Sequence, residues 1–140
     1  MSTIVLGYDG SSSANAALSK TIELAPALGA SVVVVFGFYI SPLAGGDVHD
    51  FKERLEGIGS HEVARAVADL EAAGIEASGR VVSIRPADAI LAAAEETGAA
   101  MIVVGTVGES PISGALLGSV VLKLVQKSSI PLLVVPTQEG

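Results

Sequence analysis

Short apolar runs separated by turn residues recur along the chain. Four of them are apolar at nearly every position, over residues 3–8, 31–38, 100–104 and 130–136, as is typical of strands buried on both faces of a parallel sheet. Residues 75–84 instead mix apolar and polar positions, which is typical of an outer strand. The pattern therefore predicts five strands, and it places the third of them at an edge.

Helical periodicity fills the intervals between these strands. Apolar residues recur every three or four positions over residues 14–28, 50–73 and 87–96, and again from Leu117 or Gly118 to residue 126. Pro26 is expected to kink the first helix or end it early, because proline has no amide hydrogen to donate. Gly57 and Gly59 are expected weak points of the second helix. Gly29, Gly74 and Gly98 are expected to end the first three helices, and Pro86 to begin the third.

The alternation of strands and helices predicts the fold class. Five parallel strands joined by four helices form an open, doubly wound α/β sheet with helices on both faces, and residues 1–140 are expected to be one domain. Such a sheet binds ligands at the carboxyl ends of its strands, where the strand order reverses. Asp9 follows the first strand and Gly105 follows the fourth, so we place the reversal between these two strands.

A glycine-punctuated stretch follows the fourth strand. Its spacing is G-x-x-G, nine residues and G-S, formed by Gly105, Gly108, Gly118 and Ser119. Glycine lets backbone amides approach a ligand, and a helix that begins near Gly118 directs its positive end at an anion. The stretch is neither a P-loop nor a G-x-G-x-x-G dinucleotide fingerprint. It predicts a polyphosphate site, although turn glycines and a plain helix cap at Ser119 would give the same residues.

Composition and charge narrow the function. The net charge of −7, with only eight scattered lysine and arginine residues, argues against a general nucleic-acid-binding protein. No apolar run approaches the roughly 18 residues of a membrane span, and residues 1–3 lead into a strand rather than a signal peptide. The absence of cysteine excludes disulfides and thiolate zinc sites and fits a reducing compartment. We therefore expect a cytoplasmic protein that does not bind membranes.

Catalytic chemistry has few candidate residues. The chain has no cysteine and no nucleophile elbow, and no base is placed to activate water. His49 and His61 have no paired carboxylate motif, so we assign both to solvent. No catalytic residue is assigned, and any hydrolysis of ATP is expected to be slow.

Several segments together resemble the universal stress protein family, and the likeness covers essentially the whole chain. They are I-V-L-G-Y-D-G-S-S near the start, M-I-V-V-G-T, L-L-G-S-V-V, and S-I-P-L-L-V-V-P near the end. The ATP-binding members are similar in carrying G-x-x-G, nine residues and G-[ST]. The resemblance implies an adenine nucleotide alpha hydrolase-like sheet with strand order 3-2-1-4-5. It also implies a homodimer joined through the fifth strand, which is bounded here by Ile130 and Pro136.

The resemblance also implies a set of nucleotide-binding residues. Asp9 would hold the ribose or adenine, and Gly7, Tyr8 and Gly37 would line the base pocket. The residues that would hold the ribose and phosphates are Gly105, Val107, Gly108, Gly118, Ser119 and Val120.

Two positions depart from the family pattern. Glu109 stands where many members have a basic residue, and Val107 stands where a polar residue is frequent. Mg²⁺ would then have to neutralise much of the phosphate charge. Lys123 lies one helical turn past Ser119, where it is within reach of a phosphate but is expected to face solvent.

Two functions follow. The first is a stress-response or regulatory protein that binds ATP with Mg²⁺ between the first and fourth strands and acts as a nucleotide-dependent homodimer on an unknown protein partner. The alternative is a dimeric interaction module of the same fold that has lost nucleotide binding, of which Glu109 would be the sign. An enzyme of adenylate chemistry is disfavoured because no catalytic constellation accompanies the pocket.

Overall fold

Five parallel strands and four helices alternate along the chain in the computed structural model, which describes residues 2–41, 48–107 and 117–137. The elements are β1 (Ser2–Gly7), α1 (Ser12–Leu28), β2 (Ala30–Gly37), α2 (Val48–Ala72), β3 (Ala77–Val82), α3 (Pro86–Thr97), β4 (Met101–Gly105), α4 (Ser119–Lys127) and β5 (Leu132–Val135). The strand order is β3-β2-β1-β4-β5, and every neighbouring pair is parallel. The predicted fold class, strand order and edge position of the third strand are confirmed.

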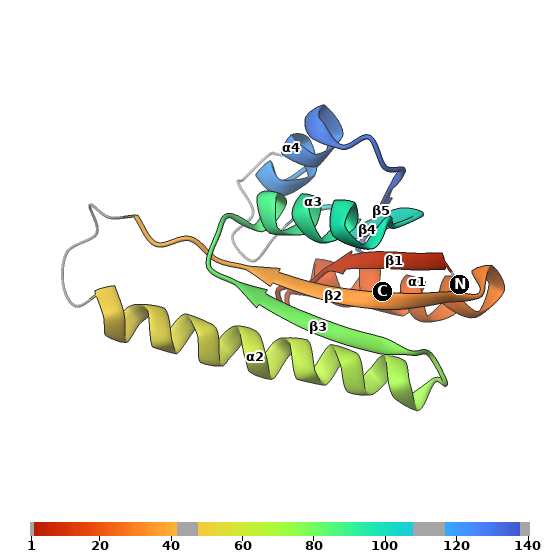
Figure 1. Cartoon of the computed structure of the whole chain (residues 1–140), viewed down its shortest axis with the longest axis horizontal. Coiled ribbons are helices and arrows are strands. Elements are labelled where there is room, and N and C mark those ends of the chain that lie inside the picture. Colours follow the sequence, from red (N-terminus) through yellow and green to blue (C-terminus); the bar gives the residue numbers. More distant parts are fainter. Residues whose placement is uncertain (1, 42–47, 108–116, 138–140) are drawn as a thin grey trace.

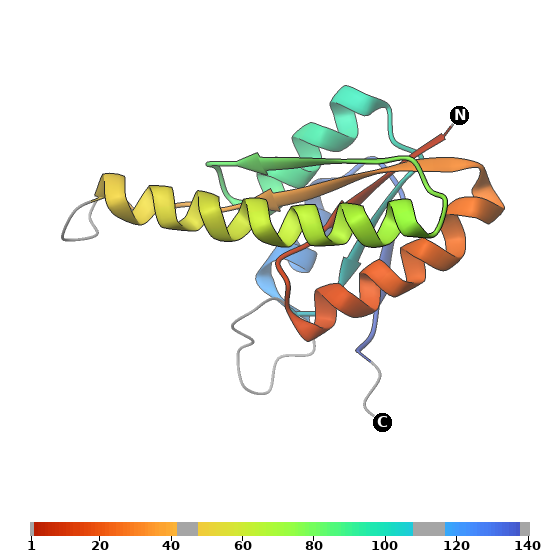
Figure 2. The ribbon, with the colours of Figure 1, turned by 90° about the horizontal axis from the view of Figure 1, so that it is seen from below.

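The helices cover both faces of the sheet (Figures 1 and 2). The core has one cluster with α1 and α2 and a second with α3 and α4. Alternate residues of β1 serve the two clusters: Ile4 and Leu6 belong to the first and Val5 to the second, and all three are fully buried. Burial on both faces explains why the central strands are continuously apolar.

Helix α1 continues past Pro26 to Leu28, so the expected early end is wrong. Pro26 lacks the amide that would donate to the Ile22 carbonyl, but this is one hydrogen bond of a 17-residue helix, and the proline itself is exposed. The fully buried Ala25 holds the last turn against the core. Gly29 closes the helix in the left-handed conformation, and its amide donates to the carbonyl oxygens of Ala25 and Pro26.

Helix α2 is continuous through Gly57 and Gly59, and its amino-terminal part reaches beyond the sheet (Figure 1). The two glycines have different surroundings. A Cβ at Gly59 would lie 2.6 Å from a ring carbon of Phe36, whereas a Cβ at Gly57 would meet no atom within 4 Å. Gly59 therefore permits the close approach of α2 to β2. At Gly57 no neighbouring atom is close enough to require the absence of a side chain.

Element ends differ from the predicted ones by one or two residues. Pro86 is the first residue of α3, as expected, and Gly98 ends that helix in the left-handed conformation. Helix α4 begins at Ser119, slightly later than expected. Within the described residues, no helix is both long and apolar enough to cross a membrane.

Candidate functional site

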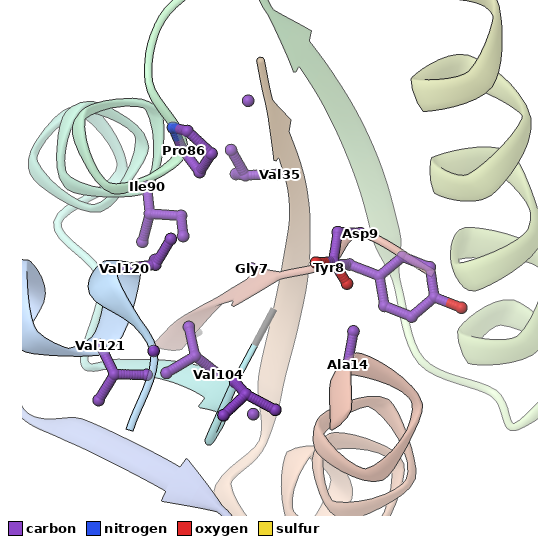
Figure 3. A pocket seen from close by; sticks show the side chains of 14 residues that line it. Gly7, Tyr8, Asp9, Ala14, Val35, Pro86, Ile90, Val104, Val120 and Val121 are labelled. Carbon is purple, nitrogen blue, oxygen red and sulfur yellow. The ribbon is translucent and has the colours of Figure 1, made fainter. Parts of the chain in front are cut away.

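A cavity lies where β1 and β4 end side by side (Figure 3). Leu6 pairs with Val103, so β1, which ends at Gly7, and β4, which ends at Gly105, finish within one residue of each other. The cavity has about 550 Å³ of empty space, part of which is open to solvent. Its lining residues are Gly7, Tyr8, Asp9, Ala14, Val35, Gly37, Pro86, Ile90, Val104, Gly105, Val107, Gly118, Val120 and Val121.

The structure brings most of the predicted site residues together. Eight of the ten line this cavity, namely Gly7, Tyr8, Asp9, Gly37, Gly105, Val107, Gly118 and Val120. Ser119 lines an adjoining hollow instead. Gly108, together with Glu109, lies outside the described residues. Their role in binding a ligand stays a prediction.

Apart from Val120, sequence reasoning missed the apolar part of the cavity wall. Figure 3 shows Val35, Ile90 and Val104 around the space, with Pro86 at the start of α3 beside it. Ile90 is 3% exposed and Val104 is 4% exposed, so both also belong to the core. A run of valines in the sequence does not show which valine will line a cavity, because that depends on how the strands and helices are arranged around the end of the sheet. The apolar wall suits the flat face of a heterocyclic base.

The glycines at the strand ends make room for neighbouring elements. A Cβ on Gly105 would lie 2.1 Å from the Ser13 hydroxyl oxygen and 2.4 Å from the Ser13 carbonyl oxygen. A Cβ on Gly7 would approach only side-chain atoms, those of Ile90 at 2.6 Å and Val104 at 3.0 Å. Gly105 is therefore required for the packing of α1 on β4, whatever its part in binding.

Asp9 lies at the cavity wall and also supports the turn that leads into α1. Its Oδ1 accepts a hydrogen bond of 3.0 Å from the Ser11 amide. Ser11 is the N-cap of α1, and its hydroxyl oxygen accepts a bond of 3.1 Å from the Ala14 amide. The Asp9 carboxylate is thereby held at the open end of β1.

Tyr8 contributes to the cavity wall while its phenol points toward α2, away from Ile90 and Val104 (Figure 3). The phenol is held by two polar side chains: its hydroxyl donates to Asn15 Oδ1 at 2.6 Å and accepts from Arg65 Nη2 at 2.5 Å. Arg65 also pairs with Glu62 at 3.1 Å. Burial raises the pKa of Tyr8 above its ordinary value of 10.0, while Arg65 acts in the opposite direction.

Helix α4 begins beside the cavity without a side-chain cap. Its N-cap is Gly118, whose amide donates to the Thr106 carbonyl oxygen at 2.7 Å. Ser119 is the first helical residue, so the alternative that made it the N-cap is wrong. Lys123 does not simply face solvent: it forms an ion pair of 3.0 Å with Asp88 and lines the adjoining hollow.

The sheet topology and the position of the cavity define an open, doubly wound α/β protein with its candidate ligand site where the strand order reverses. The model of the universal stress protein family matches residues 1–136. The chain belongs to this family.

Individual relatives agree with this assignment. The chain is 35% identical over 136 residues to a universal stress protein of Thermus aquaticus, covering 95% of this chain and 97% of the relative. A solved universal stress protein in complex with cAMP is 28% identical, with a TM-score of 0.74 and 98% of each chain covered. The structure of the hypothetical protein MJ0577 has a TM-score of 0.86 at 24% identity, covering 99% of this chain and 98% of that one. The last comparison supports the fold alone.

Proposed function

We propose that this protein binds an adenine nucleotide in the cavity between the ends of β1 and β4. The observation that carries the proposal is the combination, in one cavity, of apolar walls with the uncapped start of α4. Apolar walls suit a base, and the unpaired amides of a helix start suit a phosphate. The solved relative in complex with cAMP adds support, because cAMP contains both groups.

Each side of the cavity has a role in this proposal. The base lies against Gly37 and Ile90, and the Asp9 carboxylate accepts hydrogen bonds from the ribose hydroxyls. The phosphates lie toward the start of α4, where Ser119 and Val120, the first two helical residues, present backbone amides. Gly108, outside the described residues, belongs to the same proposed set.

We propose ATP with Mg²⁺ as the bound form. Among the described residues, no group of three histidine or acidic side chains is placed to hold a metal ion. Magnesium in nucleotide sites is nevertheless held mainly by phosphates and water, with one or two carboxylates. Because Asp9, which lines the cavity, is assigned to the ribose, the proposed Mg²⁺ is held by the phosphates and water.

The proposed biological unit is a homodimer joined through β5, with a cytoplasmic role in stress response or regulation. β5 lies at the end of the sheet and pairs with β4. Its Leu132, Leu133 and Val134 are only half-buried in the single chain. An apolar edge strand of this kind is protected when a second subunit covers it.

Isothermal titration tests the nucleotide proposal. The wild-type protein is titrated with MgATP, ATP without Mg²⁺ and AMP. A Gly7→Ala variant places a methyl group against Ile90 and Val104 and reduces the cavity, so it should weaken nucleotide binding about tenfold. Gly57→Ala is the matched control, since its methyl group enters open space on α2. A wild-type protein that gives no heat at millimolar nucleotide, while remaining a dimer, would instead be the interaction module without nucleotide.

A further inference from the structure

A second hollow adjoins the proposed nucleotide cavity, and it differs from the cavity in having two cationic side chains in its wall. It shares Pro86 and Val120 with the cavity. Its remaining wall includes Arg85 and Lys123, together with Tyr39 and the first residue of α4, Ser119. We call this hollow the basic annex. A ligand that fills the cavity therefore lies beside the annex, with Pro86 and Val120 in contact with both spaces.

Two helices begin at the basic annex. Arg85 is the N-cap of α3, and its side chain makes no capping hydrogen bond. Helix α4 starts at Ser119, and its N-cap Gly118 has no side chain. Both helices, of 12 and nine residues, therefore direct their positive ends toward the same hollow without a side-chain cap.

The charged side chains leave a positive excess at the annex. The Arg85 guanidinium lies 4.2 Å from the centre of the Tyr39 ring. No carboxylate in the described ranges forms an ion pair with Arg85. Lys123 Nζ lies 3.0 Å and 3.2 Å from the two carboxylate oxygens of Asp88. Among the described side chains, Arg85 and Lys123 thus contribute two positive charges and Asp88 one negative charge. The positive ends of the two helices add to this excess.

We propose that the basic annex binds the distal phosphate groups of the nucleotide, so that Arg85 and Lys123 make the protein prefer ATP to AMP. This inference rests on the proposed function, because it assumes that the base occupies the cavity. The side chains supply the positive charge that the glycine-rich backbone lacks. Tyr39 supports the Arg85 guanidinium from one side, which leaves its N–H groups available to phosphate oxygens.

Asp88 opposes this binding, since it partly neutralises Lys123 and adds negative charge beside the annex. Replacing Asp88 by asparagine removes that charge and frees Lys123. The Asp88→Asn variant should therefore bind ATP more tightly than the wild type, by about threefold to tenfold, with little change for adenosine.

The experiment compares dissociation constants for adenosine, AMP, ADP and ATP at fixed Mg²⁺. The proteins are the wild type, Arg85→Gln and Lys123→Gln, and the control is Lys127→Gln, an exposed lysine at the other end of α4. Each annex variant should lower the ratio of ATP to AMP affinity about tenfold and leave adenosine binding unchanged. The control should keep the wild-type ratio. Circular dichroism establishes that each variant is folded.

Titration with inorganic pyrophosphate separates the sources of the phosphate. If neither annex variant changes the ATP to AMP ratio, the inference is overturned. A second outcome also overturns it. In that outcome pyrophosphate binds to AMP-saturated protein and Arg85→Gln weakens this binding, but the ratio of ATP to AMP affinity is the same in the variant as in the wild type. The annex would then bind a free anion and not the phosphates of the nucleotide. If the wild type binds no nucleotide, the proposed function fails. In that case the annex would still be a phosphate-binding site only if pyrophosphate binds to the wild type and Arg85→Gln weakens the binding of pyrophosphate.

Discussion

Arg65 Nη2 lies 2.5 Å from the Tyr8 hydroxyl oxygen, although the two residues are 57 positions apart. The contact joins α2 to the end of β1, next to Asp9. Because Tyr8 also donates to Asn15 on α1, one phenol connects two helices to the wall of the cavity. The position of the cavity wall thus depends on side chains that do not line it.

Replacing Tyr8 by phenylalanine tests this connection. The change removes two part-buried hydrogen bonds, the one to the Asn15 oxygen and the one from the Arg65 guanidinium, so the free energy of unfolding should fall by about 1–2 kcal/mol. Urea unfolding measures the loss. Tyr39→Phe is the control, since Tyr39 is 43% exposed, and it should change stability by less than about 0.5 kcal/mol. Equal effects of the two variants would contradict the role of the Tyr8 hydroxyl.

The raised pKa of Tyr8 predicts a loss of stability at alkaline pH. The folded chain holds the phenolic proton to a higher pH than the unfolded chain does, because burial disfavours the phenolate. The stabilisation is complete below the ordinary pKa of 10.0 and is lost as pH rises through the folded pKa. Urea unfolding between pH 8 and about 11 should show this decline for the wild type and a smaller one for Tyr8→Phe. With two tyrosines and no tryptophan, phenolate absorbance also reports the titration directly. A Tyr8 that ionises below pH 10 would refute the direction of the shift.

Gly57 and Gly59 form a matched pair on α2. Gly57→Ala should stabilise the protein by up to about 1 kcal/mol, because alanine favours the helix and the new methyl group meets no atom. Gly59→Ala should cost about 1–3 kcal/mol, because its methyl group would overlap the Phe36 ring. Thermal and urea unfolding give both values. Effects of the same sign would show that α2 does not approach β2 as closely as described.

The proposed dimer is tested by a charge on β5. Leu133→Lys should give a monomer on a sizing column with light scattering, because lysine disfavours an apolar strand edge. Leu122→Lys is the control, since it introduces the same charge at a leucine of α4 that is 51% exposed, and it should remain dimeric. Circular dichroism must show a folded Leu133→Lys protein, because Leu133 also packs against the core. A monomeric wild type, or a folded Leu133→Lys dimer, contradicts this assembly.

The fold could be predicted because its signals are local and repeated. Val32 to Val35 on β2 and Ile102 to Val104 on β4 are buried, and continuous apolar runs predict strands of this kind. Pro26 misled the prediction, because the loss of one backbone hydrogen bond at an exposed proline does not end a helix whose last turn is packed on the core. Tertiary packing of Ala25 outweighed it.

The candidate site was predictable only in part. Asp9 follows an apolar strand and Gly118 precedes the last helix, so the sequence marks both positions. Ile90 and Arg85 lie at the start of α3, far from the glycine-rich stretch, and only the strand order brings that helix to the cavity. Their contribution depends on long-range arrangement, which periodicity does not describe.

The closeness of Gly105 to Ser13 has a consequence for tracing the history of this site. Any side chain at position 105 would overlap the backbone at Ser13, so the fold itself demands glycine there. A descendant that no longer used nucleotides would still keep this glycine. Retention of the first glycine of the spacing therefore reflects the packing of α1 on β4, and loss of the ligand would be better followed at Arg85 and Lys123, which line the annex.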